Sequence, residues 1–277
     1  MSRPAAGRRL PLFRLALRRR RRMLLGLVVG MVVFEALIVV IAGTVPPTSL
    51  FGGGRTPPDA LKAFSGSTGD VSIASYAGLL GAGLVHPFWI ALQLTAVGSL
   101  GAAAVAADVE SGTVELLMTR PVTRRRLLAE RAAALAAVSL LLNAAASATV
   151  ALGVALSPDL RAAVPLGGVF AAGLLGCGFT LCLTGPVLAV SAASRRRAQV
   201  VGATVVLGAT GFALNFVALA WEPAAPLRYL SPFHYYTPGD ALARAAVPWA
   251  SLAVLSAVGL SGLVAAFVLL ERRDLAA

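Results

Sequence analysis

The residues best suited to chemistry gather in one short segment, 108–124, which lies between two long apolar runs. It combines acidic side chains with glycine, threonine and proline, the residue types that start and end helices. Ser111-Gly112 predicts the end of one helix, Thr113 the N-cap of a short new helix, and Pro121 the end of that helix. Leucines and a methionine between them supply an apolar patch. The segment, called the elbow below, therefore predicts docking onto a soluble partner rather than catalysis.

The side chains that catalysis or metal binding would need are sparse. The single lysine, Lys62, does not follow a glycine, so a Walker A nucleotide site is excluded. His86 and His234 are far apart in the sequence, and neither an H-E-x-x-H nor a G-x-S-x-G motif occurs. Cys177 and Cys182 would lie about 140° apart around a helix, which is typical of ordinary buried thiols. We therefore expect no catalytic residue, no metal and no cofactor in this chain.

Composition points to a membrane protein. Of the 277 residues, 58% are apolar and only 13% are charged, whereas a soluble domain has about 25% charged residues. An apolar run of about 20 residues crosses the hydrocarbon core as a helix. We predict an all-α polytopic membrane protein with six transmembrane helices, at about 23–43, 87–107, 127–156, 164–193, 200–221 and 249–270.

The basic residues set the expected orientation. Nineteen of the 24 lie before the first span, in or just past the connections after the second and fourth spans, or after the sixth, and these positions are all on one side. The positive-inside rule makes that side, and both termini, cytoplasmic. The clusters lack interleaved aromatic residues, so we expect no nucleic acid as a partner. The chain divides into a cytoplasmic arm (1–22), a transmembrane domain (23–270) and a cytoplasmic tail (271–277).

The arm, residues 1–22, has the spacing of an amphipathic helix. Its apolar side chains recur at helical intervals and its arginines lie on other faces, which predicts an interfacial helix among anionic headgroups of membrane lipid. A disordered basic tail is the alternative. The residues concerned are Leu10, Phe13 and Leu17 on one side, and Arg14, Arg18 and Arg21 on the other.

Two segments are expected on the external side, at 44–86 and 222–248. The first begins rich in proline and glycine, and its apolar end, 71–84, either extends the second span or forms a short interfacial helix. The second contains an aromatic run that would either anchor the chain at headgroup level or form a lid over an exit path. The lid candidates are Phe233, His234, Tyr235 and Tyr236.

Polar side chains inside the predicted spans are the remaining candidates. Glu35 is the only charged residue of the first span, where it either lines a substrate path, contacts a second copy of the chain or packs in a protonated state. Three amides favour hydrogen bonds between helices: Gln93, Asn143 and Asn215.

The elbow resembles the signature of ABC-2 type transporter permeases, which is E-x-G-T-[hydrophobic]-E-L-L-[hydrophobic]-[ST]-x-P-[hydrophobic]-[ST]-R. In that family the signature forms a coupling helix that docks on a separate ATPase. The resemblance implies an exporter subunit in the plasma membrane, most typically of a prokaryote, with two ATPase chains that bind ATP and Mg²⁺ and with a second permease copy. Carried over to this sequence, the ATPase-facing or elbow-shaping residues are Glu110, Gly112, Thr113, Glu115, Leu116, Leu117, Pro121 and Arg124.

Other classes are left open by the residues alone. A non-transporting relay, which passes ATPase motion to a periplasmic partner, would use the same elbow. A secondary transporter or channel would need more ionisable residues or broken helices at mid-membrane than Glu35 and Pro186 supply. An intramembrane enzyme is disfavoured because no catalytic constellation lies within the predicted spans.

Overall fold

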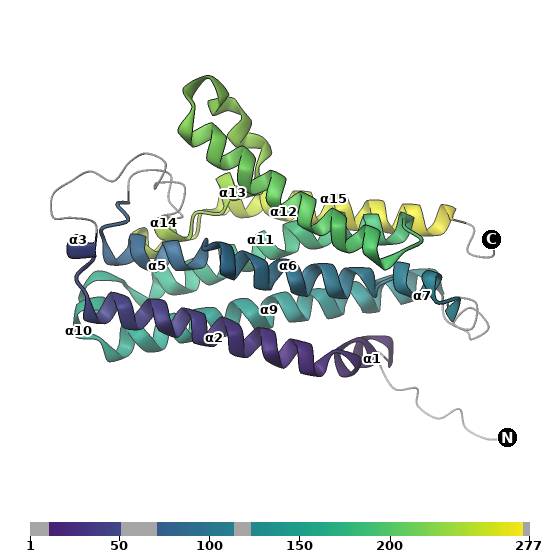
Figure 1. Cartoon of the computed structure of the whole chain (residues 1–277), viewed down its shortest axis with the longest axis horizontal. Helices are drawn as coiled ribbons and strands as arrows, with labels where there is room; N and C mark the ends of the chain where they lie inside the picture. The colour runs from purple at the N-terminus through teal and green to yellow at the C-terminus, as the bar shows by residue number, and fades with distance from the viewer. Residues whose placement is uncertain (1–10, 51–70, 114–122, 274–277) are drawn as a thin grey trace.

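The computed structural model describes residues 11–50, 71–113 and 123–273, and this part of the chain forms helices and no strand. Six segments are long and apolar enough to cross a membrane, and Figure 1 shows them side by side in a bundle. The prediction of an all-α protein with six spans is thus confirmed. The spans are α2 (Arg21–Thr44), α5 (Tyr76–Leu84) with α6 (Pro87–Ala102), α9 (Arg124–Leu156), α11 (Leu166–Ala193), α12 (Arg197–Ala220) and α15 (Trp249–Arg272).

Short helices mark the two ends of the bundle (Figure 1). One end, called the elbow end, carries α1 (Pro11–Arg19) and α7 (Ala106–Glu110) together with the last turns of α15. The opposite end, called the far end, carries α3 (Pro47–Leu50), α10 (Pro158–Ala163) and α14 (Pro238–Arg244). The remaining short helices, η1 (Glu222–Leu230) and α13 (Pro232–Tyr235), follow α12, whose last turns project from the bundle with η1.

The second span is longer than the predicted range 87–107, because α5 extends it toward the far end, which was one of the two alternatives for segment 71–84. The Ser75 hydroxyl caps α5 by accepting the N–H of Gly78 at 3.0 Å. The helix breaks at Val85-His86, since Pro87 disfavours a helical residue before it. The carbonyl of Leu84, released by this break, accepts the Tyr236 hydroxyl at 3.1 Å. A side chain distant in sequence therefore stabilises the bend.

The N-terminal arm begins with a helix that is tied to the third span. The Glu130 carboxylate of α9 accepts the backbone N–H groups of Leu12 and Phe13, at 2.8 and 3.1 Å. These are the first N–H groups of α1, which have no partner within their own helix. Leu12 is the buried residue of α1, although the sequence pattern had placed the apolar side of the arm at Leu10, Phe13 and Leu17. The break at Arg20 then separates α1 from α2.

Helix α11 lies at the centre of the bundle. It is the most buried span and packs against α6, α9, α12, α14 and α15. Its most extensive contact is with α15, where glycines let the two backbones approach closely. A Cβ atom at Gly185 would overlap the carbonyl oxygen of Gly259, and one at Gly262 would overlap the backbone at Gly185-Pro186. This contact fixes α15 against the rest of the bundle.

Candidate functional site

The described base of the elbow is the short helix α7, which continues the second span after a break. Helix α6 ends at Ala102, three residues form a turn, and α7 then runs from Ala106 to Glu110. Gly112 follows with φ +67°, a left-handed conformation that glycine adopts without the cost borne by other residues. The Thr113 hydroxyl contacts the Ser111 hydroxyl at 2.8 Å. The chain therefore turns sharply where the sequence predicted a helix end.

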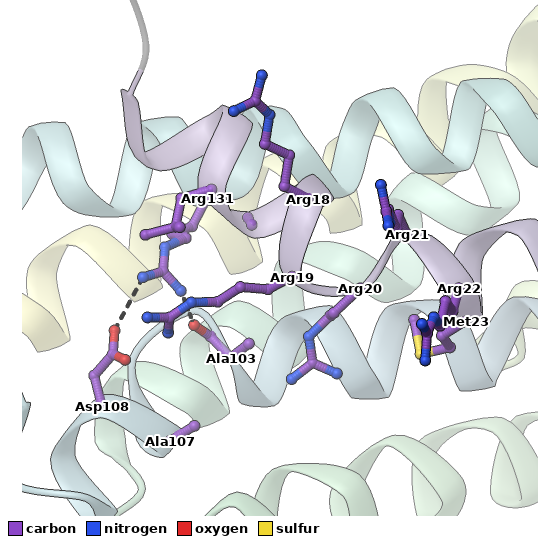
Figure 2. Close-up of a pocket in the computed structure, with 12 residues that line it drawn as sticks. Arg18, Arg19, Arg20, Arg21, Arg22, Met23, Ala103, Ala107, Asp108 and Arg131 are labelled. Carbon is purple, nitrogen blue, oxygen red and sulfur yellow. Dashed lines mark hydrogen bonds and ion pairs between the residues drawn. The ribbon is translucent and has the colours of Figure 1, made fainter.

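A buried ion pair fixes α7 to the third span. The guanidinium of Arg131 in α9 donates to the Asp108 carboxylate at 3.1 Å, and the two side chains are only 8% and 12% exposed. The same guanidinium donates to the Ala103 carbonyl, a group left free by the break between α6 and α7. Figure 2 shows both bonds. Arg131 thus binds the chain on both sides of the break, at Ala103 and at Asp108.

The central helix α11 supports the break in the second span by a different bond. The Ser191 hydroxyl oxygen accepts the N–H groups of Val105 and Ala106, at 3.2 and 3.3 Å. These N–H groups precede the first complete turn of α7 and have no carbonyl partner within it. Ser191 is fully buried, so water does not compete for the bonds.

Glu110 joins α7 to the fifth span. Its carboxylate accepts the backbone N–H of Arg197, the first residue of α12, at 2.8 Å. A carboxylate there satisfies a free N–H and lies at the positive end of the helix dipole. The sequence had assigned Glu110 to the ATPase contact or the shape of the elbow, and the structure places its carboxylate against this chain's own helix.

Arginine side chains close the remaining helix ends at the elbow end. Arg124, the first residue of α9, donates to the carbonyls of Leu270 and Arg273, at 3.3 and 2.7 Å. Arg273 donates to the carbonyls of Ala192 and Ser194, at 2.7 and 2.9 Å. Cations favour the negative ends of helices, so these bonds stabilise the ends of α15 and α11. Arg124 thereby shapes the protein around the elbow.

The elbow residues at the centre of the signature lie outside the described part of the chain. These are Glu115, Leu116, Leu117 and Pro121. Their expected contact with a partner remains a prediction from the sequence.

The intramembrane candidates lie on four different spans and near different neighbours. Glu35 of α2 and Gln93 of α6 are both fully buried, and no hydrogen-bond partner for their side chains occurs among the described residues. Asn143 of α9 donates to the Thr180 hydroxyl of α11 at 3.1 Å. Asn215 is half-buried in α12. The structure therefore gives Asn143 an interhelical hydrogen bond.

The four aromatic candidates near the sixth span separate into two pairs. Phe233 and Tyr236 are buried, and the Tyr236 ring stacks on Phe179 and Trp89 with centroids 4.5 and 5.4 Å apart. His234 and Tyr235 are half-buried at the surface. Burial and the nearby Arg228 lower the pKa of His234, so its imidazole stays neutral at pH 7. Of the four aromatic residues, only His234 and Tyr235 are therefore exposed enough to form a lid.

Several residues that hold the site together were not predicted from the sequence. The main ones are Asp108, Arg131, Ser191 and Arg197. One signal was available: Arg131 lies past the cluster Arg124–Arg126, within the third apolar run, where a charged side chain needs a partner. Its partner could not be read from the sequence, because the acidic residue lies on another helix.

Taken together, these bonds connect α7 directly to three spans, α9, α11 and α12. A force on the elbow would pass through α7 into these helices, because their links are short, mostly buried and partly charged. This arrangement suits the transmission of movement from the aqueous side into the bundle.

The model of the ABC-2 family transporter proteins matches residues 15–275, nearly the whole chain. No curated protein matches the chain.

Proposed function

Since the chain belongs to the ABC-2 family of transporter proteins, we propose that it couples ATP hydrolysis by a separate ATPase subunit to export across the cell membrane. The family match and the six apolar helices make the chain a multi-pass membrane permease of ABC-type transport. The observation that supports coupling to an ATPase is the set of bonds from α7 to α9, α11 and α12.

The proposed movement starts at the elbow. Closure of the ATPase chains would push the elbow, and α7 would pass the displacement to its three bonded spans. Spans joined at the elbow end would then change which side of the membrane a central path faces. Two ATPase chains, each with ATP and Mg²⁺, and a second permease copy would complete the assembly.

The test of the coupling is the recovery of the ATPase with the full-length chain. Glu115→Arg should reduce the amount of copurified ABC-type ATPase subunit at least tenfold, because it reverses a charge at the predicted contact. Glu115 is preferable to Glu110 for this purpose, since the Glu110 carboxylate caps α12.

The control is Glu222→Arg, the same charge reversal at an exposed residue of η1, away from the elbow. It should leave ATPase recovery and membrane insertion unchanged. Equal recovery with both variants would argue against docking at the elbow.

The proposed orientation places the elbow end and both termini in the cytoplasm. The arginine-rich helix ends at the elbow end support it, because positive residues are retained on the inner side of the membrane. In a prokaryotic cell this membrane is the plasma membrane.

Orientation predicts a labelling pattern in intact cells. Cysteine at position 227 (Leu227→Cys), on η1 beyond the fifth span, should react with a membrane-impermeant thiol reagent. Cysteine at position 195 (Arg195→Cys), at the elbow end, should react only after the cells are opened. Both original side chains are exposed, so the difference reports sidedness. Labelling of position 195 alone in intact cells would reverse the proposed topology.

A further inference from the structure

A cavity of about 690 Å³ opens at the elbow end, between the corner of α1 and α2 and the break that separates α6 from α7. Six arginines line it: the five consecutive residues Arg18–Arg22 and Arg131 of α9. Among the described residues, Asp108 is the one acidic side chain in its wall. Figure 2 shows the Arg19 side chain reaching toward Arg131 and Ala103, while Arg18 points away from them. We call this space the arginine cavity.

The arginine cavity has more positive charge than its own residues neutralise. The Asp108 carboxylate is already bound to Arg131, and the hydrogen bond of Arg20 is to the uncharged Ser99 hydroxyl. Burial, with repulsion from Arg197 and Arg131, lowers the pKa of Arg20 from its ordinary value. An anion in the cavity would relieve this repulsion.

One buried donor in the wall is also without a partner. Arg131 is 7% exposed, and its Nε has no hydrogen-bond partner among the described residues. Leaving such a donor unpaired is costly, so a ligand that supplies an acceptor is favoured. Phosphate oxygens suit arginine well, because the guanidinium can donate two parallel bonds to them.

An apolar groove of about 510 Å³ adjoins the cavity and shares Arg18 and Arg21 with it. The groove lies along the elbow-end halves of α2 and α9 and is lined by aliphatic side chains, among them Leu25, Val28 and Leu141. Leu25 and Leu141 are 63% and 50% exposed, so the groove opens to the surface that faces lipid. A cationic site beside an apolar groove fits a molecule with an anionic head and a hydrocarbon tail.

We propose that the arginine cavity and the groove together bind one anionic glycerophospholipid of the inner leaflet. Its phosphate lies among the arginines, and an acyl chain follows the groove along α2 and α9. A free phosphate would share the head contacts but leave the groove empty. The bound lipid would connect the N-terminal arm to the base of the elbow, because Arg131 lines the cavity and also binds Asp108 of α7. The choice of the inner leaflet rests on the orientation proposed above. Lipid binding at the site does not rest on the coupled ATPase.

The test is lipid binding by the purified full-length chain in neutral detergent, measured as the apparent Kd for phosphatidylglycerol by native mass spectrometry. Phosphatidylcholine serves as the neutral lipid. We expect the wild type to retain one phosphatidylglycerol per chain in preference to phosphatidylcholine. Removal of three cavity charges should weaken this binding at least tenfold, because each arginine near an anionic headgroup contributes to it. The cavity variant combines Arg18→Gln, Arg19→Gln and Arg22→Gln, all at exposed positions.

The matched control removes three exposed arginines from the same end of the molecule but outside the cavity. It should keep the wild-type affinity for phosphatidylglycerol, which separates a defined site from the effect of net charge. Equal losses in the two triple variants, or no preference of the wild type for the anionic lipid, would overturn the proposal. The control combines Arg195→Gln, Arg196→Gln and Arg272→Gln.

The source of the phosphate is distinguished by two competitors. Inorganic phosphate and glycerol phosphate carry the head chemistry without acyl chains. We expect neither to displace phosphatidylglycerol from the wild type at millimolar concentration, because they leave the groove unfilled. Displacement by either one at the affinity of the lipid would assign the cavity to a soluble anion and contradict the lipid site.

Discussion

Replacing Asp108 with alanine is expected to lower the free energy of unfolding of the purified protein by about 3 kcal/mol. The variant leaves the Arg131 guanidinium charged and nearly buried, and the Ala103 carbonyl is its remaining hydrogen-bond partner among the described residues. An uncompensated buried charge costs more than the ion pair itself contributes. Unfolding by SDS in mixed micelles, followed by circular dichroism, measures the change.

The matched double variant, Asp108→Leu with Arg131→Met, should recover a large part of that loss. It removes both charges and fills the space with apolar side chains of similar size, an exchange that is often neutral in other proteins. A double variant as unstable as Asp108→Ala would mean that the bond from Arg131 to Ala103 is what stabilises the break. A single variant as stable as the wild type would show that the ion pair does not hold α7.

Substitution at the contact between α11 and α15 is the second change with a large expected effect. Gly185→Ala adds a Cβ where the carbonyl oxygen of Gly259 lies, so the two helices must separate. Backbone cannot rotate away as a flexible side chain can, and overpacking in a close contact costs about 3 kcal/mol. The same unfolding assay should show this loss, together with easier release of α15 in limited proteolysis.

Gly202→Ala in α12 is the control, because a Cβ at that position meets no atom within 4 Å. The exchange there should be neutral or slightly stabilising, since alanine favours helix over glycine by about 1 kcal/mol. Equal destabilisation by both variants would point to a general effect of glycine on the spans. It would contradict a close contact specific to Gly185.

The helix ends show how far local sequence determines this fold. Thr123 caps α9 by accepting the N–H of Arg126 at 3.2 Å, and Gly112 has the positive φ expected at a helix end. The helix end at Gly112 was predicted from residue type, and the cap at Thr123 follows the same local rule, because capping involves residues within one turn of each other. The apolar spans were predictable for a related reason: about 20 apolar residues in succession suffice to cross a bilayer.

The second span and the arm show where local rules were insufficient. The apolar segment 71–84 was compatible with an extension of the second span or with a separate interfacial helix, and the bond from Tyr236 to Leu84 helps hold α5 as an extension of α6. In the arm, the bonds from Leu12 and Phe13 to Glu130 decide which face of α1 meets α9. Neither contact could be predicted from the spacing of nearby residues, because each joins residues that are distant in the sequence.

The sequence by itself determined the class of protein, the six spans and the place of the elbow, because hydrophobic length, helix caps and the distribution of arginines are properties of short segments. Only the tertiary structure decided which side chains hold the elbow. Glu110 and the N–H of Arg197 are 87 residues apart, and Asp108 and Arg131 are 23 apart. Such pairs depend on which helices become neighbours, and helices that are apolar on all sides give little indication of their neighbours.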